Sequence, residues 1–387
     1  MMLNHHGYNV ALYLIRKNTM PRKLTEFICL LILPALLLLP ACKSAEPATR
    51  QALYLSCKGG QHLLVYLIDP ATGQLKEVQQ LELPGQPGPL ALTDDGKHLY
   101  AALNNPPRII PMSRDTTNGQ VALLEPTTVP DFPTYLDIDA TGKYAITASY
   151  GPGTVHTFAI NPDATLAADP IQTTKTDRTA HASLIDPTNQ FVYIPHTTPN
   201  AIYQFRFDDK TGKITPIQPI VVKGGGKPNQ PAGPRHYTYH PTLGIVYVVN
   251  ELDSSVSAYQ WDKVTGVLTR FQSLTTLPAN FTQSNTCADI HLTPDGKFLY
   301  ASNRGHNSIA AYKLDKDGLM SLIDWFETEA VPREFAIDTK GQYLYSAGLR
   351  SHKLAAYAID ANTGRLSRIG NYDTPEGPIW VEVVELD

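Results

Sequence analysis

The sequence predicts an all-β fold, a seven-bladed β-propeller with four antiparallel strands in each blade. One repeated unit is an apolar strand, a polar turn and a second strand rich in aromatic and β-branched residues, as in LALTDDGKHLY and IHLTPDGKFLY. A polar hairpin follows each unit and occurs seven times, near Gly73, Gly119, Ala164, Gly212, Gly266, Gly318 and Gly364. The hairpins recur at intervals of roughly 45–54 residues, a spacing typical of propeller blades.

The strands of each blade can be assigned in order from these repeats. Six copies of the inner strand pair are present: LALTDDGKHLY, LDIDATGKYAI, SLIDPTNQFVY, YTYHPTLGIVY, IHLTPDGKFLY and FAIDTKGQYLY. A third strand with alternating polarity precedes each hairpin, as in SSVSAYQWD (254–262) and NSIAAYKLD (307–315). The period-2 pattern indicates strands with one face buried, and no apolar run after residue 41 is long enough for a helix.

The two ends of the repeat array predict how the ring closes. The first unit, which begins near residue 52, has no innermost strand of its own, whereas GPIWVEVVELD (377–387) is a strand left over at the C-terminus. We expect the C-terminal strand to complete the first blade, which would remove both open sheet edges. An open β-solenoid is the structural alternative, but it does not explain the divided unit.

Composition limits the classes of partner. The 387 residues are 42% hydrophobic and 18% charged, with a formal net charge of −4. This composition is typical of a globular protein rather than a disordered one. The balanced charge predicts no broad basic face, so we expect no nucleic-acid partner.

The N-terminus predicts export and lipid attachment. Residues 27–41 form a short apolar segment behind Arg22 and Lys23, and they end in Leu39-Pro40-Ala41 directly before Cys42. This pattern resembles a bacterial lipoprotein signal, with a signal peptide over 1–41, a linker over 42–51 and the propeller over 52–387. An ordinary cleaved signal or a buried helix is the alternative. We expect the protein at the periplasmic side of the cell envelope, in contact with the membrane only through lipid on Cys42.

The remaining cysteines and acidic residues do not predict a metal site. Cys57 and Cys287 could pair in an oxidising compartment, but two buried free thiols are the preferred interpretation. No Cys, His or acidic cluster has the spacing of a metal site, so we expect neither a metal nor another cofactor.

A cluster of polar residues is predicted at one mouth of the central channel. In a blade, the start of the innermost strand and the end of the second strand lie on the same face. Aligning the repeats on their turns brings together residues from four consecutive blades: His181, Arg235, His236, Glu251, Asp289, Arg304 and Arg333. Charged groups beside a narrow channel are costly to bury unless they are paired or bind a ligand. We interpret the cluster as a ligand site; inter-blade salt bridges are the alternative, above all for Asp289, His291 and Glu334.

Five segments resemble a known family of enzymes. They are GPRHYTYHP (233–241), VVNELDSSVSAY (248–259), LPANFTQ (277–283), ADIHLTPDGKFLYASNR (288–304) and VPREFAID (331–338). They are similar to the bacterial 6-phosphogluconolactonases of the seven-bladed lactonase family, which also includes carboxy-muconate lactonizing enzymes. The resemblance implies a metal-independent site with His181, Arg235, Glu251 and Arg304 as the catalytic group. It makes His236 and Arg333 candidates for substrate binding, and Asp289, from the same cluster, is a further candidate.

The expected reaction is hydrolysis of a sugar lactone, a small-molecule substrate. His181 would transfer protons, Glu251 would orient it or act as the base itself, and Arg235 and Arg304 would stabilise the oxyanion. A lactonizing cycloisomerase of a muconate-type diacid and a non-enzymatic surface propeller are the alternatives. Export would separate the protein from phosphorylated sugars of the cytoplasm, so the sequence leaves the phosphate open.

Overall fold

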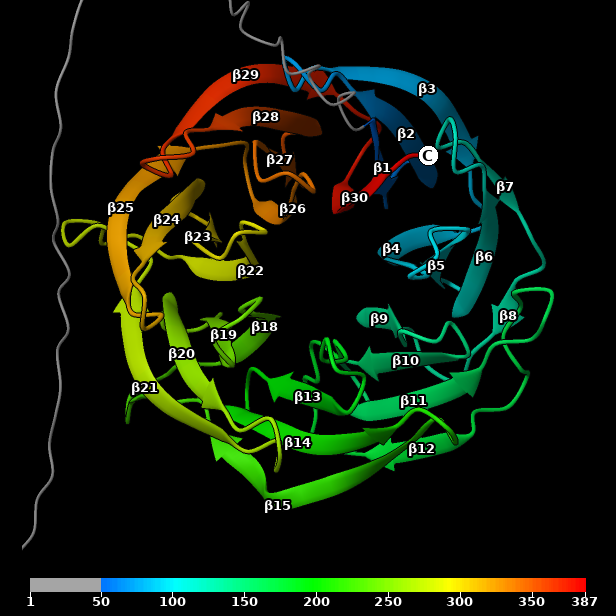
Figure 1. Ribbon diagram of the computed structural model, residues 1–387, viewed down its shortest axis with the longest axis horizontal. Coiled ribbons are helices and arrows are strands. Elements are labelled where there is room, and N and C mark those ends of the chain that lie inside the picture. Colours follow the sequence, from blue (N-terminus) through cyan, green and yellow to red (C-terminus); the bar gives the residue numbers. More distant parts are fainter. Residues whose placement is uncertain (1–49) are drawn as a thin grey trace, which may run out of the picture. The chain divides into compact units, whose positions relative to one another are not determined.

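The computed structural model describes residues 50–387, and the predicted signal segment and Cys42 lie outside the described residues. Within that range the strands form seven blades around a central channel (Figure 1). Blade 1 contains β1 (Gln51–Cys57), β2 (His62–Ile68), β3 (Leu75–Glu82) and β30 (Pro378–Glu385). Blade 2 contains β4 (Gln86–Leu92), β5 (His98–Asn104), β6 (Arg108–Arg114), β7 (Val121–Leu123) and the short β8 (Thr127–Thr128). Blade 3 contains β9 (Tyr135–Ile138), β10 (Tyr144–Ser149), β11 (Thr154–Ala159) and β12 (Gln172–Lys175).

The second half of the ring continues in the same order. Blade 4 contains β13 (Phe191–His196), β14 (Ala201–Asp208) and β15 (Lys213–Lys223), followed by the hairpin of β16 (Gly226–Lys227) and β17 (Gln230–Pro231). Blade 5 contains β18 (Pro234–Tyr239), β19 (Ile245–Asn250), β20 (Ser255–Trp261) and β21 (Leu268–Thr275). Blade 6 contains β22 (Thr286–Leu292), β23 (Phe298–Arg304), β24 (Ser308–Leu314) and β25 (Met320–Glu327). Blade 7 contains β26 (Pro332–Ile337), β27 (Tyr343–Gly348), β28 (Lys353–Ile359) and β29 (Leu366–Asp373).

The ring closes as the sequence predicts. Strand β30 pairs antiparallel with β1, so the chain's last strand is the innermost strand of its first blade (Figure 1). The register joins Gln51 to Glu385 and Tyr54 to Glu382. The described residues contain no helix long and apolar enough to cross a membrane.

Tyrosine hydroxyls connect neighbouring blades and explain the repeated hairpin. Six buried tyrosines on the second strands donate hydrogen bonds to hairpin carbonyls of the next blade at 2.6–2.9 Å: Tyr54 to Gly119, Tyr100 to Ala164, Tyr193 to Gly266, Tyr247 to Gly318, Tyr300 to Gly364 and Tyr345 to Gly73. The acceptor residues have positive φ, which glycine adopts at least cost. Aromatic residues in the second strand and glycine in the hairpin are therefore two halves of one contact.

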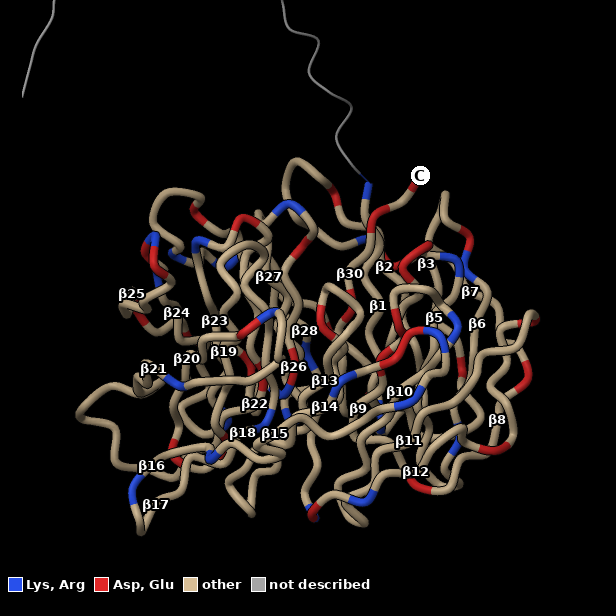
Figure 2. The backbone as a smooth tube through the Cα atoms, turned by 60° about the horizontal axis from the view of Figure 1, so that its bottom comes forward, with Lys and Arg blue, Asp and Glu red and all other residues tan. Residues whose placement is uncertain are grey.

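Apolar side chains fill the space between the blades. One cluster joins blade 1 to blade 2 and contains Leu63, Leu103 and Trp380, and another joins blades 1 and 7 through Leu55 and Tyr345. Cys57 and Cys287 are buried free thiols that do not pair with each other. Basic and acidic residues are interspersed around the ring rather than gathered on one broad face (Figure 2).

Blade 4 departs from the predicted four strands, because its innermost segment is not a regular strand. Its connections to β13 are two isolated bridges, Ala180 with His196 and Ile185 with Val192, and backbone hydrogen bonds such as that from the His181 amide to the Pro195 carbonyl at 2.9 Å. The Tyr237 hydroxyl, from blade 5, lies between β13 and the innermost segment. It accepts a hydrogen bond from the Tyr193 amide at 3.2 Å and donates one to the Leu184 carbonyl at 2.6 Å. One side chain thus takes the place of ladder hydrogen bonds at Leu184, so the segment that carries His181 is not a continuous strand.

Candidate functional site

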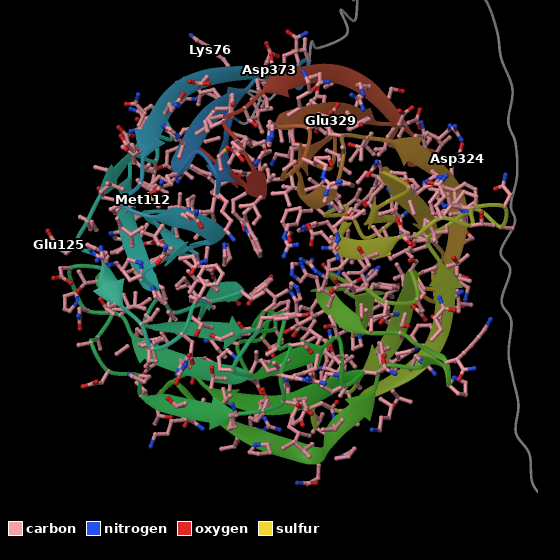
Figure 3. The ribbon with its side chains drawn as sticks, turned by 180° about the vertical axis from the view of Figure 1, so that it is seen from behind. Lys76, Met112, Glu125, Asp324, Glu329 and Asp373 are labelled. Carbon is pink, nitrogen blue, oxygen red and sulfur yellow. The ribbon has the colours of Figure 1, made fainter. Side chains whose placement is uncertain are left out.

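Side chains of the innermost strands project toward the central channel, as Figure 3 shows from behind. Four aromatic rings pack together there. The ring of His236 lies 5.1 Å from that of His181, 5.3 Å from that of Tyr135 and 5.9 Å from that of Trp380, measured between centroids. These rings, which we call the aromatic plug, separate two cavities: a mouth cavity of about 80 Å³ and a deeper chamber of about 330 Å³.

The mouth cavity is strongly cationic. Lys58, His181, Arg235 and Arg333 line it together with Glu334, and Gly88, Phe132 and Thr134 form part of its wall. Three of the predicted site residues therefore meet around one cavity. A cavity of this charge is suited to an anionic or carbonyl-containing small molecule, because guanidinium groups bind carboxylate, phosphate and oxyanion oxygens in fixed geometry.

Bulges at the entrances of the inner strands bring two side chains of one blade to the centre. The register shifts between Pro234 and His236 in blade 5 and between Pro332 and Glu334 in blade 7. In a regular strand, successive side chains point to opposite faces. The bulge relieves this alternation, so that Arg235 and His236 both belong to the polar network of the channel.

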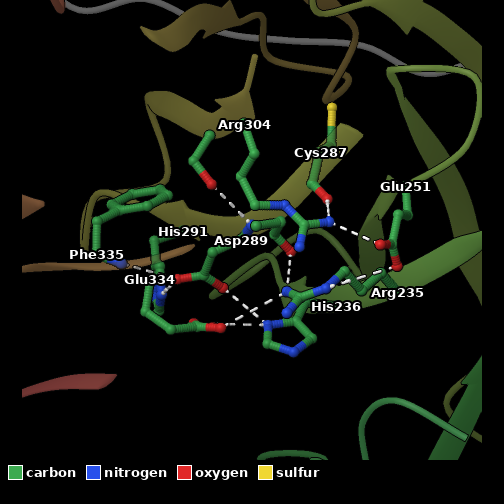
Figure 4. A network of polar contacts seen from close by, with 11 residues as sticks. Arg235, His236, Glu251, Cys287, Asp289, His291, Arg304, Glu334 and Phe335 are labelled. Atoms are coloured by element: carbon green, nitrogen blue, oxygen red, sulfur yellow. Dashed lines mark hydrogen bonds and ion pairs between the residues drawn. The ribbon is translucent and has the colours of Figure 1, made fainter. Parts of the chain in front are cut away.

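Arg235 is the centre of an ion-pair network (Figure 4). Its side chain is 1% exposed; Nε lies 3.8 Å from Glu251 Oε2, one terminal nitrogen lies 3.6 Å from Glu334 Oε1, and the same nitrogen donates to the Ala288 carbonyl. Burial, and next the charge of Arg304, lower the pKa of Arg235, and the two carboxylates oppose this. The network holds the guanidinium in place at the cavity wall.

Glu251 and Arg304 act behind the cavity wall. Arg304 donates to Glu251 Oε1 at 2.7 Å and to the Cys287 carbonyl at 2.6 Å (Figure 4). Neither side chain is among those that line the mouth cavity. Glu251 therefore faces two arginines, a position suited to fixing Arg235 rather than to taking a proton from water.

A second group of predicted residues lies between the cavity and the chamber. His236 Nδ1 lies 3.0 Å from Asp289 Oδ1, and His291 Nε2 lies 2.8 Å from Asp289 Oδ2 (Figure 4). Burial opposes ionisation of Asp289, but the charge of His291 and hydrogen bonds from both histidines hold its pKa well below the usual value. Burial and the nearby Asp289 charge raise the pKa of Glu334 well above its usual value. The charge of Arg235 opposes this rise, and the opposite directions of the two shifts make Asp289 the more acidic of the two carboxyl groups.

The same group is the closest approach to a metal site in the described part of the chain. Ligand atoms of His236, Asp289 and Glu334 lie within 4.8 Å of one another. However, the Arg235 guanidinium already lies 3.6 Å from Glu334, and Arg333 adds positive charge nearby. Positive charge at this distance opposes a divalent cation, so we interpret the three residues as an ion-pair cluster. The expected metal independence stays a prediction.

His181 is the histidine of the mouth cavity, and one nitrogen of its ring is buried without a partner. Its Nδ1 is buried without a hydrogen bond, and the ring packs edge-on against Tyr150 at 5.5 Å. Burial, and then the charge of Arg235, lower the pKa of His181 well below its usual value. A neutral imidazole on the cavity wall can accept a proton.

Two mouth residues were missed in the sequence, although the repeat could have revealed one of them. Lys58 directly follows β1, as Glu251 follows β19, so extending the same column to the first blade would have found it. Trp380 lines both cavities from β30. Trp380 lies in the closing strand. No turn follows this strand, so the alignment of the repeats on their turns could not place it.

The deeper chamber is acidic and gives a testable pH dependence. Asp137, Asp289, His291 and Glu382 line it, and burial raises the pKa of Glu382 to about 7. Between about pH 4.5 and pH 7, unfolded Glu382 is ionised while the folded form keeps its proton, so this residue lowers stability as pH rises.

We expect Glu382→Gln to become more stable than the wild type as pH rises through this window, as measured by urea unfolding. Glu385→Gln, in the same strand, is the matched control. Hydrogen bonds from Lys340 and Thr339 lower the pKa of Glu385, so its substitution should not produce a gain. A pH-independent difference between Glu382→Gln and the wild type would contradict the assignment.

Comparisons with known proteins agree with the architecture and extend it. The family model described as "Lactonase, 7-bladed beta-propeller" matches residues 49–383. The 6-phosphogluconolactonase of Pectobacterium carotovorum is 34% identical over 342 residues, which cover 87% of this chain and 100% of that protein. The 6-phosphogluconolactonase of Yersinia pseudotuberculosis is 34% identical over 336 residues, 86% of this chain and 98% of that protein. The periplasmic gluconolactonase of Pseudomonas aeruginosa has the same fold, with a TM-score of 0.79 at 21% identity over 88% of this chain and 100% of that chain.

Proposed function

The chain belongs to the lactonase family of seven-bladed β-propellers, and we propose that it opens the ester ring of a sugar lactone at the mouth cavity. One observation carries the location: His181, whose Nδ1 has no partner, shares a cavity wall with Lys58, Arg235 and Arg333. Lactone hydrolysis needs a proton acceptor beside groups that stabilise negative charge. These four residues supply both.

The proposed mechanism divides the roles by position. His181 takes a proton from water, and the hydroxide adds to the lactone carbonyl. Arg235 stabilises the oxyanion, since Glu251 and Glu334 hold its guanidinium from behind. Arg333 and Lys58 bind the acidic or hydroxyl groups of the substrate. When the tetrahedral intermediate collapses, the proton passes to the ring oxygen, and the open hydroxy acid leaves.

A panel of lactones tests the activity. We expect the purified protein to open δ- or γ-lactones of sugars faster than it opens unsubstituted lactones, as measured by proton release at constant pH. Phosphorylated and free sugar lactones are compared in the same assay, because this chain could be exported. Activity on a muconate-type diacid alone would favour the cycloisomerase, and inactivity on every compound would favour a binding propeller.

We further propose that the protein is a lipoprotein of the cell envelope. The support is the sequence alone: a short apolar segment that ends in Leu39-Pro40-Ala41 before Cys42. We expect Cys42→Ala to release the protein from membranes or to block its processing, as seen by fractionation and mass spectrometry. Cys57→Ala is the matched control, because that thiol is buried in the ring. Unchanged mass and membrane association of Cys42→Ala would refute the proposal.

A further inference from the structure

His181 and His236 are adjacent imidazoles, and each has one buried nitrogen without a partner. The unpartnered atoms are Nδ1 of His181 and Nε2 of His236. The two residues are 4% and 3% exposed, and their ring centroids lie 5.1 Å apart. An unsatisfied buried polar atom is costly, so two of them on neighbouring rings require an explanation that packing alone does not give.

The contacts of His236 fix its tautomer. Its Nδ1 lies 3.0 Å from Asp289 Oδ1, and an ionised carboxylate can only accept hydrogen bonds. His236 therefore carries its proton on Nδ1 and has a bare Nε2. Asp289 is itself fixed by His291 at 2.8 Å and by the Phe335 amide at 3.2 Å. This is the arrangement in which a carboxylate orients an imidazole that is to receive a proton.

We propose that His236 is the proton acceptor behind His181, and that Asp289 and His291 position it. This inference rests on the proposed lactonase activity. Water gives a proton to Nε2 of His181, and the proton on Nδ1 of His181 passes to Nε2 of His236 after rotation of the His181 ring. His181 changes tautomer and stays neutral, and the charge moves to His236, next to the Asp289 carboxylate. The reverse transfers return the proton to the leaving ring oxygen.

The surroundings keep both imidazoles neutral before the reaction. Burial, and then the charge of Arg235, lower the pKa of His236 to about 3. Arg333 acts on both histidines in the same direction, while Asp289 opposes it at His236. Glu334 lies 3.7 Å from His236 Nδ1. The uncharged rings of Tyr135 and Trp380 pack against His236, and that of Tyr150 packs against His181. A neutral pair with one proton on each ring is the state that a relay requires.

The kinetic test is His236→Gln. The glutamine amide can still donate to Asp289 but cannot take up a proton, so kcat should fall by roughly tenfold to a hundredfold with little change in KM. In mixtures of light and heavy water, the wild-type rate should depend on the deuterium fraction along a curve, because two protons move in the step. The rate of the variant should depend on it linearly, because only one proton moves.

Two comparisons separate a relay from a structural role. His240→Gln is the matched control, a buried histidine of the same blade that contacts the Gly296 carbonyl, and it should keep the curved dependence. Asp289→Asn should resemble His236→Gln, because an amide donor reverses the tautomer of His236. Unchanged curvature in His236→Gln would overturn the relay.

Nitrogen-15 NMR of the histidine rings gives a readout without substrate. We expect His236 to be protonated on Nδ1 and bare on Nε2 at neutral pH. A proton on Nε2 would overturn the relay, whatever the activity. A wild type that opens no lactone but shows the expected tautomer would refute the proposed lactonase activity. It would still support the proposed arrangement of protons on His181 and His236.

Discussion

Deletion of residues 378–387 should abolish the folded ring. Strand β30 pairs with β1 along its length and contributes Trp380 and Val381 to the clusters on both sides of blade 1. Loss of one buried tryptophan alone costs about 3–5 kcal/mol, and the total stability of a domain is about 5–15 kcal/mol. The deletion also exposes the edge of β1 to pairing with other chains.

Circular dichroism and light scattering measure this outcome. We expect the truncated chain to aggregate or to lose its cooperative melting transition. A synthetic peptide of residues 377–387, added during refolding, should restore the transition, and the same peptide with Trp380→Ala should not. A soluble truncation that melts like the wild type would show that closure by β30 contributes little.

Substitution of His181 should have the largest effect on activity. We expect His181→Ala to lower kcat by about two to four orders of magnitude, the range typical of a lost acid–base group. Loss of the buried ring leaves a cavity and should lower the melting temperature, but no hydrogen-bond partner of Nδ1 is left unpaired, so the chain should still fold cooperatively. His196→Gln is the control: that histidine lies in the same blade but contacts the Ile194 carbonyl and Thr176.

Arginine substitutions are a poorer test of catalysis at this site. Removing Arg235 would leave the buried Glu334 without its arginine partner, although Glu251 would keep Arg304, and breaking a buried pair costs about 3–5 kcal/mol. Loss of activity in Arg235→Ala would therefore combine lost oxyanion stabilisation with lost stability. If His181→Ala kept wild-type turnover while Arg235→Ala unfolded, the network would be structural, as the salt-bridge alternative holds.

The sequence alone determined the ring and its closure. Strand period, turn residues and hairpin glycines are local properties. They repeat because each blade packs against its two neighbours in the same way. The spare C-terminal strand was visible because the repeat was incomplete at both ends. The same alignment placed His181, Arg235 and Arg333 at one mouth, because the starts of innermost strands must converge in a propeller.

Only the tertiary structure decided which of these residues line the cavity and which hold other site residues in place. Bulges before His236 and Glu334 direct neighbouring residues of the same strand toward the centre of the ring. No residue pattern in the sequence predicted these bulges. Glu251 faces two arginines from other strands, which the spacing along the chain could not show. The Tyr237 hydroxyl replaces ladder bonds in the neighbouring blade. Each of these depends on contacts between residues far apart in sequence, and a repeat encodes what the blades have in common, not where one blade departs from the others.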